Sequence, residues 1–219
     1  MNLDAAKFLG KCCQATYEMT DDLVPSLPQG YTVAATFRAN NEPFAFLATS
    51  ADDSVLAFRG TDSAMDWVMD GVFTQVEFGG GLVHAGGLAL YLQMRNDLLK
   101  HQPKKITGHS LGGMLATFAA YDFPSATCYT FAAPRAGDVA FADALDAKTQ
   151  MVRVVNVFDL IPHLPPFEIP DPIQGRMAHF AHAGKQHSVS FFHGMNWHKN
   201  HAIENYLAAL DGETAAQAA

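Results

Sequence analysis

Apolar residues recur along this chain with two periods, which divide it into expected strands and helices. Short apolar runs bounded by turn residues predict strands at 31–38, 43–49, 54–59, 104–107, 125–132 and 151–158. Apolar residues spaced by three or four predict helices at 4–19, 64–72, 87–100, 114–121, 139–148 and 202–210. Early strands followed by alternating strand and helix predict an α/β fold, with a mostly parallel mixed sheet and helices on both faces.

The segments between these elements contain no repeat and no linker long enough to separate two domains. Residues 23–30 and the proline-rich stretch 162–175 are expected loops. A chain of 219 residues fits one domain spanning 1–219, and we expect the tail 211–219 to be frayed.

Composition and charge narrow the class of protein. The chain is 49% hydrophobic and 16% charged, so it can bury a sizeable core. Its net charge is -8 and no block of Lys and Arg stands out, which makes nucleic acid and anionic membrane surfaces poor partners. No apolar run approaches the length of a transmembrane segment.

The cysteines and the first residues of the chain indicate in which cellular compartment the protein is expected. Cys12 and Cys13 are adjacent and Cys128 lies in an apolar run, so no disulfide framework is expected. The chain opens without a basic segment followed by an apolar one, and no signal peptide is expected. This fits a cytoplasmic location, or secretion with a leader removed.

Residues 107–113 carry the strongest chemical signal. They read Thr-Gly-His-Ser-Leu-Gly-Gly and place a Gly-x-Ser-x-Gly pattern between a predicted strand and a predicted helix. A serine on such a turn is lifted out of the sheet, and the crowded backbone favours glycine on both sides. The helix that follows adds partial positive charge where an oxyanion would form. Ser110 is therefore the expected nucleophile.

A serine nucleophile needs a base, and an acid that orients the base. Asp159 follows the strand at 151–158 and is the expected acid, with Asp171 in the proline-rich loop as a weaker alternative. Among the 10 histidines, His201 directly precedes the last predicted helix and is the expected base. His198 and His187 are its rivals. In α/β-hydrolases these groups follow one another in the order serine, acid, histidine.

Two backbone donors would hold the oxyanion. The amide of Leu111 follows the nucleophile, and Thr61 leaves the early strand at 54–59. Thr61 is alternatively the N-cap of the helix expected from about residue 64, and one residue can serve both purposes.

Taken together, these residues resemble the class 3 lipase family, the fungal-type triacylglycerol lipases and their bacterial relatives. The matching motifs, in order, are Phe-Arg-Gly-Thr at 58–61 with Asp-Trp at 66–67, Val-His-Ala-Gly at 83–86, the serine motif at 107–113, and the segments at 130–138, 156–166 and 201–207. They extend over about two-thirds of the chain.

The resemblance implies an α/β-hydrolase fold, with Ser110 as nucleophile, Asp159 as orienting acid and His201 as base. It also implies Thr61 and Leu111 as oxyanion donors, no metal and no organic cofactor. The sequence departs from the family at Ala132, where glycine is usual, and this change is expected to alter packing only. The disulfides of secreted fungal members are not supported by these cysteines.

The substrate expected from this resemblance is an acyl ester or lipid. Residues 62–78 form a possible lid that would contact a lipid–water interface, although a permanently packed helix is the alternative. Tentative substrate-binding residues are Trp67, His109, Leu160, Ile161 and Leu164. A short-chain carboxylesterase and a phospholipase A1 use the same triad and stay open.

Two other classes of function compete with an enzyme of this kind. The histidine-dense stretch 179–201 contains two His-x-x-His pairs, at 179 and 182 and at 198 and 201, which is a spacing that can share a metal. No cysteine or glutamate accompanies them in a recognised pattern. A catalytically silent relative would lack a triad residue, and all three are present.

Overall fold

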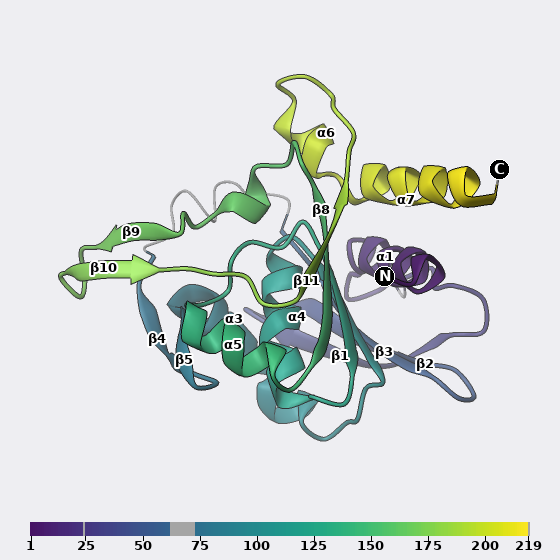
Figure 1. The fold of residues 1–219 in the computed structure, drawn as a ribbon. Coiled ribbons are helices and arrows are strands. Elements are labelled where there is room, and N and C mark those ends of the chain that lie inside the picture. Colours follow the sequence, from purple (N-terminus) through teal and green to yellow (C-terminus); the bar gives the residue numbers. More distant parts are fainter. Residues whose placement is uncertain (24, 62–72, 219) are drawn as a thin grey trace.

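The structure of this chain is a computed structural model that describes residues 1–23, 25–61 and 73–218 (Figure 1). Its central sheet has seven strands in the order β1-β2-β3-β6-β7-β8-β11. The strands are β1 (Thr32–Ala39), β2 (Glu42–Thr49), β3 (Ser54–Phe58), β6 (Lys105–His109), β7 (Thr127–Phe131), β8 (Gln150–Asn156) and β11 (Lys185–Val189). The first three pair antiparallel, and the strands from β3 to β11 pair parallel.

Helices cover both faces of this sheet (Figure 1). One face is covered by α3 (Ala85–Leu98), α4 (Leu111–Asp122) and α5 (Val139–Asp146). The other face is covered by α1 (Leu3–Thr16) and α7 (Ile203–Ala218), which also pack against each other. The predicted mostly parallel α/β architecture is therefore confirmed.

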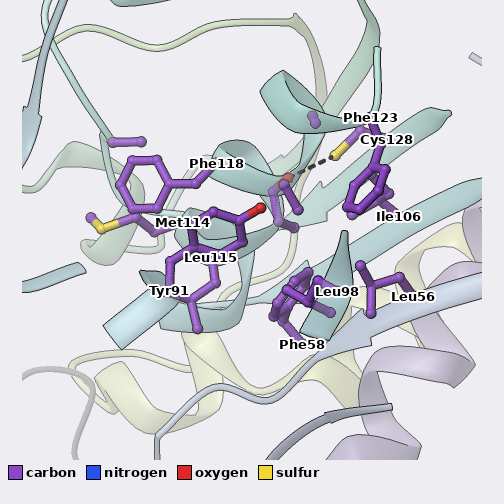
Figure 2. Close-up of a cluster of buried hydrophobic side chains, with 14 of the residues drawn as sticks. Leu56, Phe58, Tyr91, Leu98, Ile106, Met114, Leu115, Phe118, Phe123 and Cys128 are labelled. Carbon is purple, nitrogen blue, oxygen red and sulfur yellow. Dashed lines mark hydrogen bonds between the residues drawn. The ribbon is translucent and has the colours of Figure 1, made fainter. Parts of the chain in front are cut away.

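The core between the sheet and α4 explains why the strands read as continuous apolar runs. Figure 2 shows Leu56 and Phe58 of β3 and Ile106 of β6 gathered with Leu115 and Phe118 of α4. These five side chains are almost fully buried. Parallel strands covered on both faces have no polar side, so strict alternation is lost. Cys128 also belongs to this core, and all three cysteines are buried and form no disulfide.

Several short elements escaped the sequence prediction. Two hairpins, β4 (Gln75–Phe78) with β5 (Gly81–His84) and β9 (Glu168–Asp171) with β10 (Arg176–His179), lie outside the main sheet. A short 3-10 helix, η1 (Ile161–His163), follows β8, and α6 (Trp197–His201) precedes α7. The last helix continues to Ala218, whereas we expected a frayed tail from residue 211, because this alanine-rich segment has good helix propensity.

The possible lid at 62–78 is only partly covered by the structure. Residues 62–72, including Trp67 and the expected helix 64–72, lie outside the described residues. The remainder of that range contains β4, and the glycines at 79 and 80 form its tight turn into β5. Among the described residues, no helix is long and apolar enough to cross a membrane.

A buried histidine forms the N-cap of α3. His84 is 2% exposed, and its Nδ1 accepts a hydrogen bond of 3.2 Å from the Gly87 amide. Protonation at Nδ1 would break this cap. Burial lowers the pKa of His84 from 6.5 to about 4.

We expect the free energy of unfolding to fall as the pH drops below 6.5. Below this pH, His84 binds a proton in the unfolded chain but stays neutral in the native one. One such histidine contributes a slope of about 1.4 kcal/mol per pH unit between its two pKa values. The variant His84→Asn keeps a cap acceptor and should lose this slope. Urea unfolding at pH 7, 6, 5 and 4.5 measures it, and an unchanged pH slope in the variant would contradict the assignment.

Candidate active site

Ser110 occupies a strained turn between β6 and α4. Its φ of 59° and ψ of -129° place a non-glycine residue at positive φ. The Ser110 amide donates a hydrogen bond of 2.9 Å to the Phe131 carbonyl of β7, and this bond holds the turn against the sheet. Such outliers persist only where surrounding structure imposes them, and they gather at functional sites.

Two glycines make this turn possible. A Cβ on Gly108 would lie 2.1 Å from the Gly112 carbonyl oxygen, and a Cβ on Gly112 would lie 2.3 Å from the Phe58 carbonyl oxygen. Neither contact is sterically allowed. The glycines of the serine motif are therefore required by the close approach of α4 to β3 and β6.

Ala132, directly after β7, also has a positive φ, of 50°. The expectation that alanine at this position alters packing only is wrong, because the backbone adopts the left-handed conformation that glycine tolerates better.

The structure brings Asp159 and His201 together, 42 residues apart in the chain. His201 Nδ1 lies 2.8 Å from Asp159 Oδ2, and the two residues are 7% and 1% exposed. A carboxylate only accepts hydrogen bonds, so Nδ1 donates its hydrogen and the Nε2 lone pair stays available. This is the tautomer that a general base needs.

Three donors converge on the Asp159 carboxylate. Besides His201, the Tyr206 hydroxyl donates a hydrogen bond of 2.7 Å to Oδ2. The Ile161 amide donates a hydrogen bond of 3.0 Å to Oδ1. The Tyr206 oxygen in turn accepts a hydrogen bond of 3.0 Å from the backbone amide of Asn156, at the end of β8. Burial and the adjacent Asp159 charge raise the pKa of Tyr206 well above its ordinary value, so the phenol stays a donor.

His109 supports the backbone of His201. Its Nε2 lies 2.8 Å from the His201 carbonyl oxygen, and its Nδ1 lies 2.6 Å from the Tyr17 hydroxyl. A carbonyl only accepts, so Nε2 carries the hydrogen and the Tyr17 hydroxyl donates to Nδ1. Burial lowers the pKa of His109 well below 6.5, which keeps the ring neutral. Both ring nitrogens are thus engaged, and His109 also lines the cavity of about 280 Å³ that contains His201, so its expected contact with substrate stays a prediction.

The expected oxyanion segment passes beside the serine. A Cβ on Gly60 would lie 3.2 Å from Ser110 Cβ and 2.8 Å from the His109 carbonyl oxygen, so the backbone at Gly60 nearly touches the serine turn. Thr61 follows it and lines a cavity of about 280 Å³ together with His201. Leu111 begins α4 directly behind Ser110, where the helix dipole is positive.

Two buried polar atoms belong to the expected nucleophile and the expected base. Within the described residues, Ser110 Oγ and His201 Nε2 make no hydrogen bond although both are buried. Buried polar groups are normally paired, so an unpaired hydroxyl on the strained turn and an unpaired nitrogen on the oriented histidine are consistent with a catalytic role. Their partners in function would be each other and a bound substrate.

The remaining expected substrate residues differ in position. Leu160 is 56% exposed beside Asp159, and Leu164 is partly buried. Ile161 is 0% exposed, so its side chain lies in the interior and does not line an open surface.

The rival acid and histidines have other contacts. Asp171 accepts hydrogen bonds from Thr74 and from the backbone at 173 and 174, which fixes the β9–β10 hairpin. His187 pairs with Glu213 of α7 at 2.8 Å. His198 is exposed and lines the same cavity as His201.

The histidine-dense stretch is dispersed over different elements. His179 lies near Glu168 in the β9–β10 hairpin, whereas His182 contacts the Pro162 carbonyl at 2.7 Å. Over the described ranges, no three metal-binding side chains are grouped to hold an ion.

Sequence reasoning missed the residues that hold the pair in place, namely Tyr17, Asn156 and Asn200. Asn156 Nδ2 donates a hydrogen bond of 3.0 Å to the carbonyl of Asn200, the residue before His201. Asn156 begins one of the matching motifs, but nothing in the sequence assigns a role to it, to Tyr17 or to Asn200. The only available signal was an apolar context unusual for asparagine at the end of a buried strand.

Comparison with known proteins agrees with this geometry. The fold is that of the α/β-hydrolases: the crystal structure of a mutant form of MDLA from Penicillium cyclopium aligns with a TM-score of 0.71 and 25% identity over 87% of this chain and 80% of that one. The family model "Lipase (class 3)" matches residues 55–169. The chain therefore belongs to the class 3 lipase family, as its motifs predicted.

Two curated relatives show the range of the family. The secreted mono- and diacylglycerol lipase A of Penicillium cyclopium is 34% identical over 129 residues, which are 51% of this chain and 42% of that protein. The chloroplastic phospholipase A(1) DAD1 of Arabidopsis thaliana is 29% identical over 150 residues, 52% of this chain and 34% of that protein. In each case the match spans less than half of the relative.

Removing the Tyr206 hydroxyl should lower the stability of the folded protein. Tyr206→Phe takes one donor from the buried Asp159 carboxylate and the acceptor from the Asn156 amide. We expect a loss of about 2–4 kcal/mol in the free energy of unfolding, since the buried Asn156 amide loses its Tyr206 acceptor and the Asp159 carboxylate loses one of its three donors. Urea unfolding measures it, with Tyr121→Phe on the partly exposed end of α4 as a matched control. Equal, small losses in both variants would refute the structural role.

Proposed function

We propose that this protein is a serine ester hydrolase that cleaves fatty-acyl esters, with acylglycerols as its substrate class. The described residues would act as one catalytic unit. The observation that carries the proposal is the pair of buried, unbonded atoms Ser110 Oγ and His201 Nε2, with His201 oriented through Nδ1 by Asp159. The mono- and diacylglycerol lipase relative supports the substrate class.

In the first half of the reaction, Ser110 Oγ attacks the ester carbonyl carbon and His201 Nε2 takes the hydroxyl proton. The oxyanion is held by the amides of Leu111 and Thr61. The carbon–oxygen bond to the alcohol then breaks, and His201 returns the proton to the leaving alcohol. An acyl group is left on Ser110.

In the second half, water attacks the acyl carbonyl while His201 accepts a proton. The acid leaves, and the proton returns to Ser110 Oγ. Asp159 stays ionised throughout and stabilises the imidazolium that forms twice per cycle. Every step uses side chains and amides of this chain together with water.

The first test is hydrolysis of p-nitrophenyl esters with acyl chains from two to sixteen carbons. Ser110→Ala should lower kcat by at least about 10⁴-fold. Ser188→Ala, at an exposed serine of β11, is the matched control and should retain full activity. Equal rates in wild type and Ser110→Ala would overturn the serine mechanism. Activity confined to the shortest chains would favour a short-chain carboxylesterase.

The second test separates the two acids. Asp159→Asn keeps the shape of the side chain but stabilises the wrong imidazole tautomer, so kcat should fall by about 10⁴-fold with KM little changed. Asp171→Asn is the control, because that carboxylate accepts hydrogen bonds from Thr74 and from the amides of Ile173 and Gln174, away from the proposed site. Normal kcat in Asp159→Asn together with a collapse in Asp171→Asn would move the acid to the β9–β10 hairpin.

A further inference from the structure

A second, small cavity lies on the face of the sheet that α4 and α5 cover. Its volume is about 10 Å³, which is room for one group about the size of a water molecule. Polar residues from three elements line it, namely Thr117 of α4, Arg153 of β8 and His182 shortly before β11, together with small residues such as Ala133 and Ala183. It shares no lining residue with the cavity beside His201, so it is a separate place in the molecule.

Arg153 is the unusual residue in this cavity, because it is a buried cation. The residue is 9% exposed, and its Nη2 donates a hydrogen bond of 3.2 Å to the neutral side-chain amide of Gln186. Its Nε is buried and has no hydrogen-bond partner among the described residues. Burial lowers the pKa of Arg153 from 12.5 to about 10, so the guanidinium is still charged at neutral pH. A buried charge is normally compensated by a group of opposite charge.

The chain itself supplies no such group at close range. Within residues 1–23, 25–61 and 73–218, no carboxylate oxygen lies within 4.0 Å of the guanidinium of Arg153 or of Arg135. The charge of Asp146 reaches Arg153 only at longer range. Asp146 is exposed and accepts a hydrogen bond of 2.6 Å from the Gly184 amide. The positive charge of Arg153 is therefore not neutralised by a direct ion pair.

More positive charge faces the same region. Arg135 is partly buried and donates hydrogen bonds to the backbone carbonyls at 163 and 165. Burial, and then the charges of Arg153 and Arg135, lower the pKa of His182 from 6.5 to about 3. The His182 ring is therefore neutral, and its Nε2 donates a hydrogen bond of 2.7 Å to the Pro162 carbonyl. Two guanidinium groups thus set a positive potential here, in a chain with a net charge of -8.

A second group without a partner lies on the neighbouring strand. Thr130 of β7 is opposite Arg153 in the register of β7 and β8, so the two side chains point to the same face of the sheet. Thr130 Oγ1 is buried and makes no hydrogen bond within the part of the chain that the structure describes. A hydroxyl can donate its hydrogen to an anion, as the guanidinium Nε–H can.

We propose that this cavity binds one monatomic anion of the size of chloride, which accepts hydrogen bonds from Arg153 Nε and the Thr130 hydroxyl. Water could accept from the same donors but brings no charge. An anion gains from two guanidinium groups in a place where burial weakens screening. The small volume excludes sulfate and phosphate. Bound there, the anion joins β7 and β8 to the segment before β11. This inference goes beyond the proposed function and does not rest on it.

Urea unfolding in two salts of equal ionic strength tests the proposal. The probe is 100 mM sodium chloride, compared with 100 mM sodium gluconate, whose anion is too large for the cavity. A site with a Kd of about 10 mM should lower the unfolding equilibrium constant about tenfold in chloride. Arg153→Met removes the charge and the donor, a kind of change that buried sites often tolerate, and should unfold equally in both salts. Arg176→Met, at an exposed arginine of β10, is the matched control and should keep the tenfold difference.

Thr130→Val provides a second, milder variant that keeps the shape of the side chain. Loss of one hydrogen bond to an ion should weaken chloride binding about tenfold, which leaves a difference of about twofold between the salts. Crystals grown in sodium bromide give a direct measurement. The anomalous signal of bromine should show one ion beside Arg153 Nε in the parent and none there in Arg153→Met.

Three results would overturn the proposal. Equal unfolding of the parent in chloride and gluconate would mean that the cavity holds water only, or an adventitious ion only if bromide appears in the crystal. An undiminished chloride effect in Arg153→Met would place the effect elsewhere on the protein. Absence of bromide beside Arg153 Nε would exclude the site directly. Ester hydrolysis enters none of these measurements, so their outcome and that of the proposed function are read separately.

Discussion

The buried carboxylate of Asp159 is the constraint on which the rest of this structure depends. An ionised group in an apolar interior is stable only when donors surround it. Here the donors come from α6, from α7 and from the turn after β8. Satisfying one charge therefore fixes two helices against the end of a strand. Because α7 packs on α1, the same requirement extends to the first helix of the chain (Figure 1).

The proposed catalytic atoms are held by a network that joins distant parts of the sequence. Tyr17, after α1, reaches His109, and His109 in turn bonds the backbone of His201. Parallel strands bring their carboxyl ends to one edge of the sheet, where ligands bind in α/β folds. Loops after β3, β6, β8 and β11 all arrive at this edge. The hydrogen bond from the Ser110 amide to Phe131 and the close packing at Gly108 and Gly112 hold Ser110 at its positive φ.

Much of this arrangement was predictable because apolar periodicity and one short motif carry local information. The strands from β1 to β8 in the main sheet and the helices α1, α3, α4 and α5 follow from it. β11 was missed because Lys185–Val189 is a largely exposed edge strand rich in polar residues, so no apolar run marks it. Asn156 and Tyr17 were missed for a different reason. Their roles depend on partners 44 and 92 residues away, and no spacing in the sequence records such contacts.

Two asparagines, Asn156 and Asn200, join the backbone next to the proposed catalytic base to the loops after β8 and β11. Asn156 donates to the Asn200 carbonyl beside His201, and it accepts from the amides of Phe158 and Phe191. A force on the exposed loops therefore acts on hydrogen bonds that also position His201. Buried networks of this kind are stiff, since breaking one bond leaves several polar groups unpaired. In this arrangement, the loops after β8 and β11 and the proposed catalytic histidine belong to one hydrogen-bonded unit.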